Sequence, residues 1–140
     1  SYARKKNLTP YDVLIIASMV EKETLAPDER KLVAAVIYNR LHARMPLGID
    51  ATLRYGFKIQ PTQSILQSQL DSTNPYNSRK IPGLPPTPIA NPGLASIQAA
   101  AHPAKVDYPY FVRNPDRVPH VFTASDTAFA RYECAHGYGC

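Results

Sequence analysis

The first third of the chain limits the fold most, because it contains two helix starts in quick succession. Thr9 is a good N-cap residue and Pro10 suits the first helical position, while Pro27 restarts the chain after a short break. Apolar residues recur at helical spacing in both segments. We therefore predict two consecutive helices, the first running to about Thr24 and the second to about Ala43.

The rest of the chain carries most of the 14 prolines, which predict long ordered loops rather than regular structure. We predict an α+β fold: a mainly helical single domain over residues 1–140, whose helices pack around a small antiparallel hairpin. The other expected segments are a loop at 46–56, a short helix at 64–70, a helix from Asn91 to Pro103, strands at 108–113 and 120–124, and a last helix at 126–134.

Composition suits one compact core, since the chain has 140 residues of which 44% are hydrophobic. The net charge of +5 is compatible with an anionic partner. However, the basic residues are scattered and no nucleic-acid recognition motif is present, so nucleic-acid binding is a weak hypothesis. No apolar stretch approaches the roughly 20 residues of a membrane span. The polar start leads us to expect a fragment of a longer protein.

The cysteines and histidines do not predict a metal site. Cys134 and Cys140 are the only cysteines, and either a disulfide between them or two free thiols fits the sequence. The four histidines lack the spacing of metal ligands. We therefore expect no metal and no cofactor.

Two glutamates, Glu21 and Glu23, stand near the end of the first predicted helix. Glu23 lies seven residues after Ile16 and so continues the apolar stripe, whereas Glu21 points elsewhere. A partly buried acid there suits general acid catalysis. It equally suits a structural role, in which Glu23 pairs with Arg30 or Arg40 or caps a neighbouring helix. The helical spacing alone leaves both roles open.

The order of motifs resembles a known family. The segments ASMVEKET, NRL, MPLGIDATLRYG, YNS, GLPPTPIANPG, AAAHPA and YFV occur in this order and together resemble the YceG-like family. The resemblance extends from about Leu8 to Thr123. GLPPTPIANPG followed by AAAHPA is its most specific part, and it thins towards the two cysteines.

The resemblance implies a catalytic domain from the C-terminal part of an extracytoplasmic bacterial protein, tethered by a membrane anchor that this chain does not contain. It implies endolytic cleavage of peptidoglycan glycan strands, with cell-wall synthesis proteins as further partners. Glu23 is then the catalytic residue, since it is the second glutamate of EKET. One acid would protonate the MurNAc–GlcNAc oxygen and then, as a base, let the MurNAc C6 hydroxyl close on C1 to give a 1,6-anhydro end.

The other motif residues are expected to line the substrate groove. For each, an ordinary structural role stays open: a turn for Asp50 and Asn77, core packing for the tyrosines, a salt bridge for Arg40. GLPPTPIANPG is expected to form a rigid wall, with Asn91 capping the next helix and His102 ending it. The predicted substrate-binding residues are Asn39, Arg40, Asp50, Thr52, Tyr55, Tyr76 and Asn77.

Two further functions remain open at the level of sequence. One is a hydrolase of the same polymer, a muramidase that uses Glu23 with Asp50, because retaining and inverting glycosidases need a second carboxylate. The other is a glycan-binding module without catalysis. The chemistry of the product ends separates the first from a lytic transglycosylase, and a Glu23→Gln variant separates the second.

Overall fold

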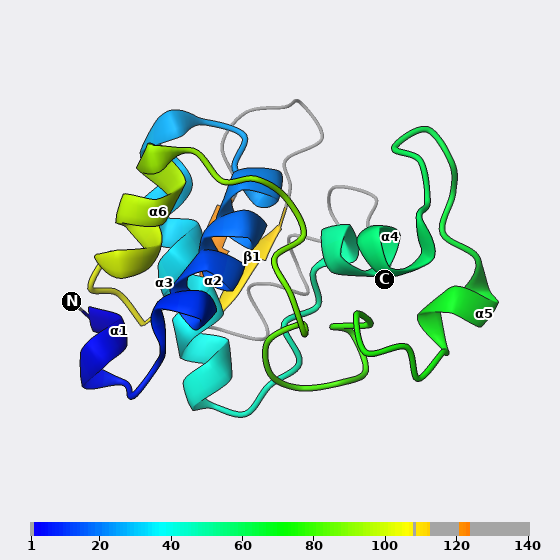
Figure 1. Ribbon diagram of the computed structural model, residues 1–140, viewed down its shortest axis with the longest axis horizontal. Coiled ribbons are helices and arrows are strands. Elements are labelled where there is room, and N and C mark those ends of the chain that lie inside the picture. The colour runs from blue at the N-terminus through cyan, green and yellow to red at the C-terminus, as the bar shows by residue number, and fades with distance from the viewer. Residues whose placement is uncertain (1, 108, 113–120, 124–140) are drawn as a thin grey trace.

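The computed structural model describes residues 2–107, 109–112 and 121–123 (Figure 1). Helices make up most of its regular structure. The elements in chain order are α1 (Tyr2–Lys5), α2 (Pro10–Glu23), the 3-10 turn η1 (Pro27–Glu29), α3 (Arg30–His42), α4 (Asp50–Phe57), α5 (Gln67–Leu70), α6 (Leu94–Ala101), β1 (Tyr110–Val112) and β2 (Val121–Thr123).

Helix α2 begins where the sequence predicts it. The Thr9 hydroxyl accepts the Asp12 N–H at 3.1 Å, and the Asp12 carboxylate accepts the Thr9 N–H at 2.9 Å, which is a complete capping box. The helix ends at Glu23, where the Thr24 hydroxyl donates to the Val20 carbonyl at 2.6 Å. The six consecutive residues 15–20 are all buried. The middle of α2 is therefore surrounded by protein on every side.

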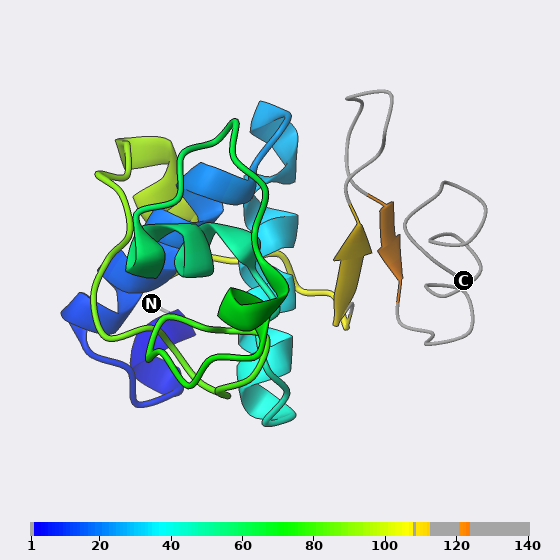
Figure 2. The same ribbon diagram turned by 90° about the vertical axis from the view of Figure 1, so that its right-hand side faces the viewer.

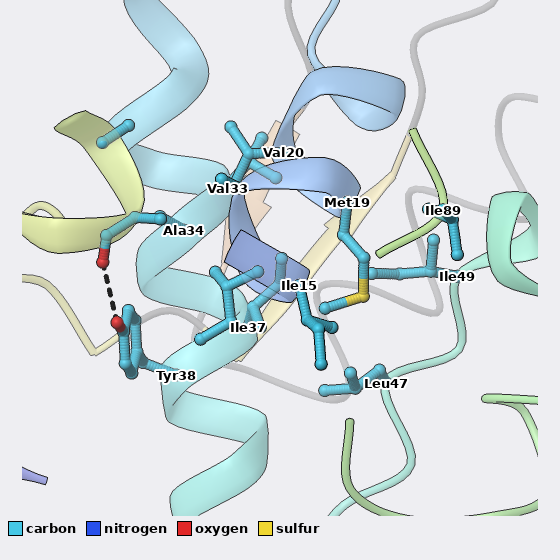
Figure 3. Packing of buried hydrophobic residues seen from close by; sticks show 14 residues of the cluster. Ile15, Met19, Val20, Val33, Ala34, Ile37, Tyr38, Leu47, Ile49 and Ile89 are labelled. Carbon is cyan, nitrogen blue, oxygen red and sulfur yellow. Dashed lines mark hydrogen bonds between the residues drawn. The ribbon is translucent and has the colours of Figure 1, made fainter. Parts of the chain in front are cut away.

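Helix α2 is the centre of the fold. It packs against α6, α3 and α4, and α3 also packs against α6. Figure 3 shows the side chains of α2 and α3 meeting, with loop residues closing the side towards α4. The core comprises Ile15, Ile16, Ala17, Met19 and Val20 of α2, Val33, Ala34, Ile37 and Tyr38 of α3, Ala99 and Ala100 of α6, and Leu47, Ile49 and Ile89 from loops.

The predicted α+β class is wrong for the part of the chain described here. The core residues come from helices and loops, so the helices pack on one another and not around a hairpin. The two predicted strand segments contain only three paired residues each, with Phe111 opposite Phe122 in antiparallel register. Figure 2 shows this pair beside α3, outside the group of helices. Two strands of three residues are too short to form a layer on which helices could pack.

Three local predictions also need comparison with the structure. Residues 46–56 are not loop throughout: 46–49 have no regular structure, as predicted, but α4 occupies Asp50–Phe57. Helix α6 begins at Leu94 with Gly93 as its N-cap, so Asn91 is not the cap, whereas His102 is the C-cap as predicted. Helix α1 was not predicted. The last predicted helix, the turn between the strands, and both cysteines lie outside the described residues.

Candidate active site

Glu21 caps a helix that lies far away in the sequence. Its Oε1 accepts the Gly93 N–H at 2.8 Å and the Ser96 hydroxyl at 3.1 Å, which satisfies one of the backbone N–H groups at the start of α6. The Gly93 N–H lowers the pKa of Glu21 from its usual value, and Ser96 and the charge of Arg30 act in the same direction against partial burial. Glu21 therefore fastens α6 to the end of α2.

The cap predicts that the protein loses stability in acid. A carboxyl whose pKa is lowered by folding contributes stability that is present above its unfolded pKa, near 4.5, and is lost as the pH falls through the folded value. We expect the free energy of unfolding of Glu21→Gln to fall less between pH 6 and pH 3 than that of the native protein. Urea unfolding at both pH values measures this. An equal fall in the free energy of unfolding of the two proteins between pH 6 and pH 3 would contradict the role of Glu21.

Glu23 is the last residue of α2, and the turn behind it is held in place. The buried carboxylate of Glu29 accepts the N–H groups of Leu25 and Ala26 at 2.9 and 3.3 Å. Glu23 itself is partly exposed. Its backbone is therefore fixed on both sides, by the helix before it and by the Glu29 turn after it.

The loop around Ser78 positions the start of α4. Its hydroxyl accepts the Ile49 N–H at 2.9 Å, and its carbonyl accepts the Gly48 N–H at 2.8 Å. The hydroxyl of Thr52 lies 2.8 Å from both the Ser78 hydroxyl and the Ile49 carbonyl. Thr52 therefore joins two motif segments through these hydrogen bonds. Because it is completely buried, it is not placed to touch a substrate.

Asp50 is the first residue of α4 and forms an ion pair at the surface. Its Oδ1 accepts a hydrogen bond of 2.7 Å from Arg79 Nε, and about half of each side chain is exposed. Asp50 follows Ile49, which lies near Met19 in the core (Figure 3). Glu23 lies one helical turn beyond Met19. Asp50 therefore begins α4 next to a core residue, and α4 packs against α2.

Tyr55 and Tyr76 form an aromatic surface beside this region. Their ring centroids are 5.2 Å apart with the rings tilted by 56°, and Tyr55 is 48% exposed. The Tyr76 hydroxyl lies 2.7 Å from the hydroxyl of Thr87, which connects Tyr76 to the proline-rich loop, residues 83–93. An exposed ring held in place by a second ring is suited to stacking on a sugar face.

This aromatic surface depends on the close approach of Gly56 to Tyr76. A Cβ atom on Gly56 would lie 2.6 Å from the Tyr76 Cβ and 2.9 Å from the Asn74 side chain. We expect Gly56→Ala to lower the free energy of unfolding by about 1–3 kcal/mol, because α4 must move away from the loop. Urea unfolding measures this, with the exposed Ser68→Ala as control. An unchanged stability would contradict this packing.

Asn77 is a structural residue and not a surface hydrogen-bond donor. It is completely buried, and its Nδ2 reaches the carbonyls of Leu70 and Ser72 at 2.9 and 2.8 Å and that of Gln69 at 3.4 Å. Its side-chain Oδ1 accepts the Arg79 N–H at 3.3 Å. Asn77 therefore holds the loop that follows α5, and the structure does not place it against a substrate.

Asn39 and Arg40 are occupied in holding the segment that follows α6. Asn39 Nδ2 donates to the Val106 carbonyl at 2.8 Å, and Arg40 Nε donates to the Pro109 carbonyl at 2.6 Å. Arg40 also donates to the carbonyl of Leu47 at 2.9 Å. Burial lowers the pKa of Arg40 from its usual value. Both residues are thus placed to organise the backbone around α3.

The sequence analysis did not single out several polar residues that hold the loops and helices together. Ser18 is buried inside α2 and accepts the Ile89 N–H at 3.0 Å, which fastens the proline-rich loop to the helix. Ser78, Glu29 and Arg79 were missed in the same way. A serine within an apolar helical run was the one local signal, because a buried hydroxyl needs a partner.

The described residues were also searched for metal and membrane features. In residues 2–107, 109–112 and 121–123, three or more histidine, cysteine or acidic side chains do not gather as a metal site would require. In the same part of the chain, the helices are too short or too polar to cross a bilayer.

Comparisons with known proteins agree with the resemblance found in the sequence. The model of the YceG-like family matches residues 1–133. An endolytic murein transglycosylase of Bacillus subtilis is 39% identical over 112 residues, and one of Streptococcus pneumoniae is 40% identical over 116. Each alignment covers 80% of this chain but only 31% and 21% of the relative. A crystal structure of a YceG-like protein from Listeria monocytogenes, 33% identical, superposes with a TM-score of 0.84 over 93% of this chain and 42% of its own.

Proposed function

The chain belongs to the YceG-like family, and from this membership we propose that it is the catalytic part of an endolytic peptidoglycan lytic transglycosylase. It spans less than a third of the curated relatives that bear the name endolytic murein transglycosylase. The proposal therefore transfers their named activity to the segment that this chain shares with them. It places the site of action on the cell-wall side of the membrane, where the polymer lies.

One observation carries the proposal: the family motifs are fastened to the end of α2 at which Glu23 stands. Ser18 binds the proline-rich loop, Glu21 binds the start of α6, and Met19 lies near Ile49. Glu23 thus stands at the end of the helix to which three segments distant in sequence are fastened, and this supports the proposal. This is how an active site is commonly built, with catalytic groups held by a rigid scaffold.

In the proposed mechanism Glu23 is the general acid and then the general base. Its proton passes to the glycosidic oxygen as the bond from MurNAc C1 to that oxygen breaks, and GlcNAc leaves as an alcohol. The carboxylate then takes the proton of the MurNAc C6 hydroxyl, whose oxygen forms the new bond to C1. Glu23 ends protonated, as it began.

The surrounding residues would bind and orient the glycan. Tyr55, supported by Tyr76, offers a face for sugar stacking. The exposed pair of Asp50 and Arg79 offers a carboxylate and a guanidinium to hydroxyl groups of the sugars. This mechanism requires no second catalytic carboxylate, so Asp50 acts only in binding.

Analysis of the products tests the proposal. Purified peptidoglycan is digested with the protein, and the new ends are identified by mass spectrometry. We expect 1,6-anhydroMurNAc ends, which are lighter than reducing ends by one water, distributed within strands and not released from their termini. Reducing ends would show a hydrolase and direct attention to Asp50. Absence of cleavage by the folded protein would contradict the assignment of catalysis to this segment.

A further inference from the structure

A cavity of about 570 Å³ lies on the side of the molecule formed by α1, α3 and the segment 102–107. Its floor is aromatic and apolar: Tyr38 and Ala35 are buried there, and Tyr2 meets Tyr38 edge to face with centroids 4.9 Å apart. The Tyr38 hydroxyl donates to the Ala100 carbonyl at 2.7 Å. Burial raises the pKa of Tyr38 to about 12, so this floor stays uncharged at neutral pH.

The rim of the cavity is mainly cationic. Lys5 from α1 and Lys105 from the segment 102–107 both line it and are exposed. His102 and Asp107 complete the charged and titratable groups among the lining residues. Two lysines against one aspartate favour a ligand with negative charge, while the aromatic floor favours one that also carries an apolar part.

The wall that bears Lys105 is fixed against α3. On one side of it the Ala104 N–H donates to the Lys31 carbonyl at 3.1 Å, and on the other the Val106 carbonyl accepts from Asn39 at 2.8 Å. Lys105 therefore stands between two anchored residues. Because this segment is already held in place before binding, the protein loses less conformational entropy when a ligand enters the cavity.

We propose that this cavity binds the carboxylate-bearing stem peptide of the peptidoglycan strand, with Lys5 and Lys105 facing its carboxylates and Tyr2 and Tyr38 its aliphatic part. This inference rests on the proposed function, because it names a second part of the same substrate. It separates the binding of the peptide from the cleavage of the glycan. The cavity lies on α3, whereas the cleavage site lies at the end of α2.

Binding of a soluble fragment tests the proposal. Muramyl dipeptide with its free glutamyl carboxylate, and the same compound with every carboxylate converted to an amide, are titrated by isothermal titration calorimetry. The proteins are the native chain, Lys5→Gln/Lys105→Gln, and the charge-matched control Lys58→Gln/Lys80→Gln, whose exposed lysines do not line the cavity.

We expect the acid form to bind the native protein and the control within about twofold of one another. Binding should weaken at least tenfold in Lys5→Gln/Lys105→Gln and at least tenfold for the amide. Equal binding by the two double variants, equal binding of the amide, or no binding to the native protein would each overturn the proposal. Peptide binding without glycan cleavage would instead count against the proposed function alone, and cleavage without peptide binding against the cavity alone.

Discussion

Glu23→Gln should lower the rate of glycan cleavage by at least about 10³-fold while the protein stays folded. Gln keeps the size and hydrogen-bonding shape of the side chain but has no proton to give and accepts none. Because the same carboxyl serves both proton transfers in the proposed mechanism, neither is replaced, and each is worth about 10²–10⁴-fold. The measurement is the rate at which anhydro ends appear, together with a urea unfolding curve of the variant.

Glu21→Gln is the matched control for this experiment, because it makes the same chemical change two residues earlier on the same helix. It alters the cap of α6, where Gln can still accept the bonds of Gly93 and Ser96. Cleavage should therefore stay within about threefold of native under conditions where both proteins are folded. Loss of activity in Glu21→Gln with retention in Glu23→Gln would reverse the assignment of the two acids.

Asn77→Ala should lower the free energy of unfolding by about 3 kcal/mol. The change removes the donor shared by the carbonyls of Leu70, Ser72 and Gln69 and leaves a cavity in the loop. Each buried polar group left without a partner costs about 1–3 kcal/mol, and water is expected to satisfy part of them. Urea unfolding at neutral pH measures the loss.

Asn91→Ala provides the comparison, since Asn91 is an exposed asparagine in the same proline-rich region and is not the cap of α6. Its stability should lie within about 0.5 kcal/mol of native, as for most surface substitutions. The cleavage rate of Asn77→Ala should equal that of the native protein, when it is measured at a concentration of urea at which Asn77→Ala is fully folded. A rate that falls in the folded variant, with little change in stability, would return Asn77 to the substrate-binding residues.

The two long helices could be predicted because their signals are local. The Thr9–Asp12 capping box, Pro10 and Pro27 lie within a few residues of the ends that they define, and the structure places the helices there. Helix α4 was missed because Pro46, Gly48 and Gly56 surround or interrupt it and read as loop. Gly56 is tolerated within the helix because its missing side chain makes room for Tyr76.

The family also followed from the sequence, because its motifs are short strings in a given order, and the family match over residues 1–133 confirms it. The catalytic role of Glu23 comes from that resemblance and remains a proposal. The helical wheel does not distinguish Glu23 from Glu21, because α2 is buried around its whole circumference between residues 15 and 20. A single apolar stripe does not exist on such a helix, so its direction does not select one acid.

What the sequence determined by itself was the position of the main helices and the family to which the chain belongs. The tertiary structure decided what individual polar residues do. Glu21 caps α6 across 72 residues, Ser18 binds the Ile89 N–H across 71, and Arg40 reaches Pro109 across 69. The physical reason is that a buried polar atom must find a partner, and the partner is chosen by which segments pack together. The sequence shows that such a polar residue needs a partner, but it does not show which residue that partner is.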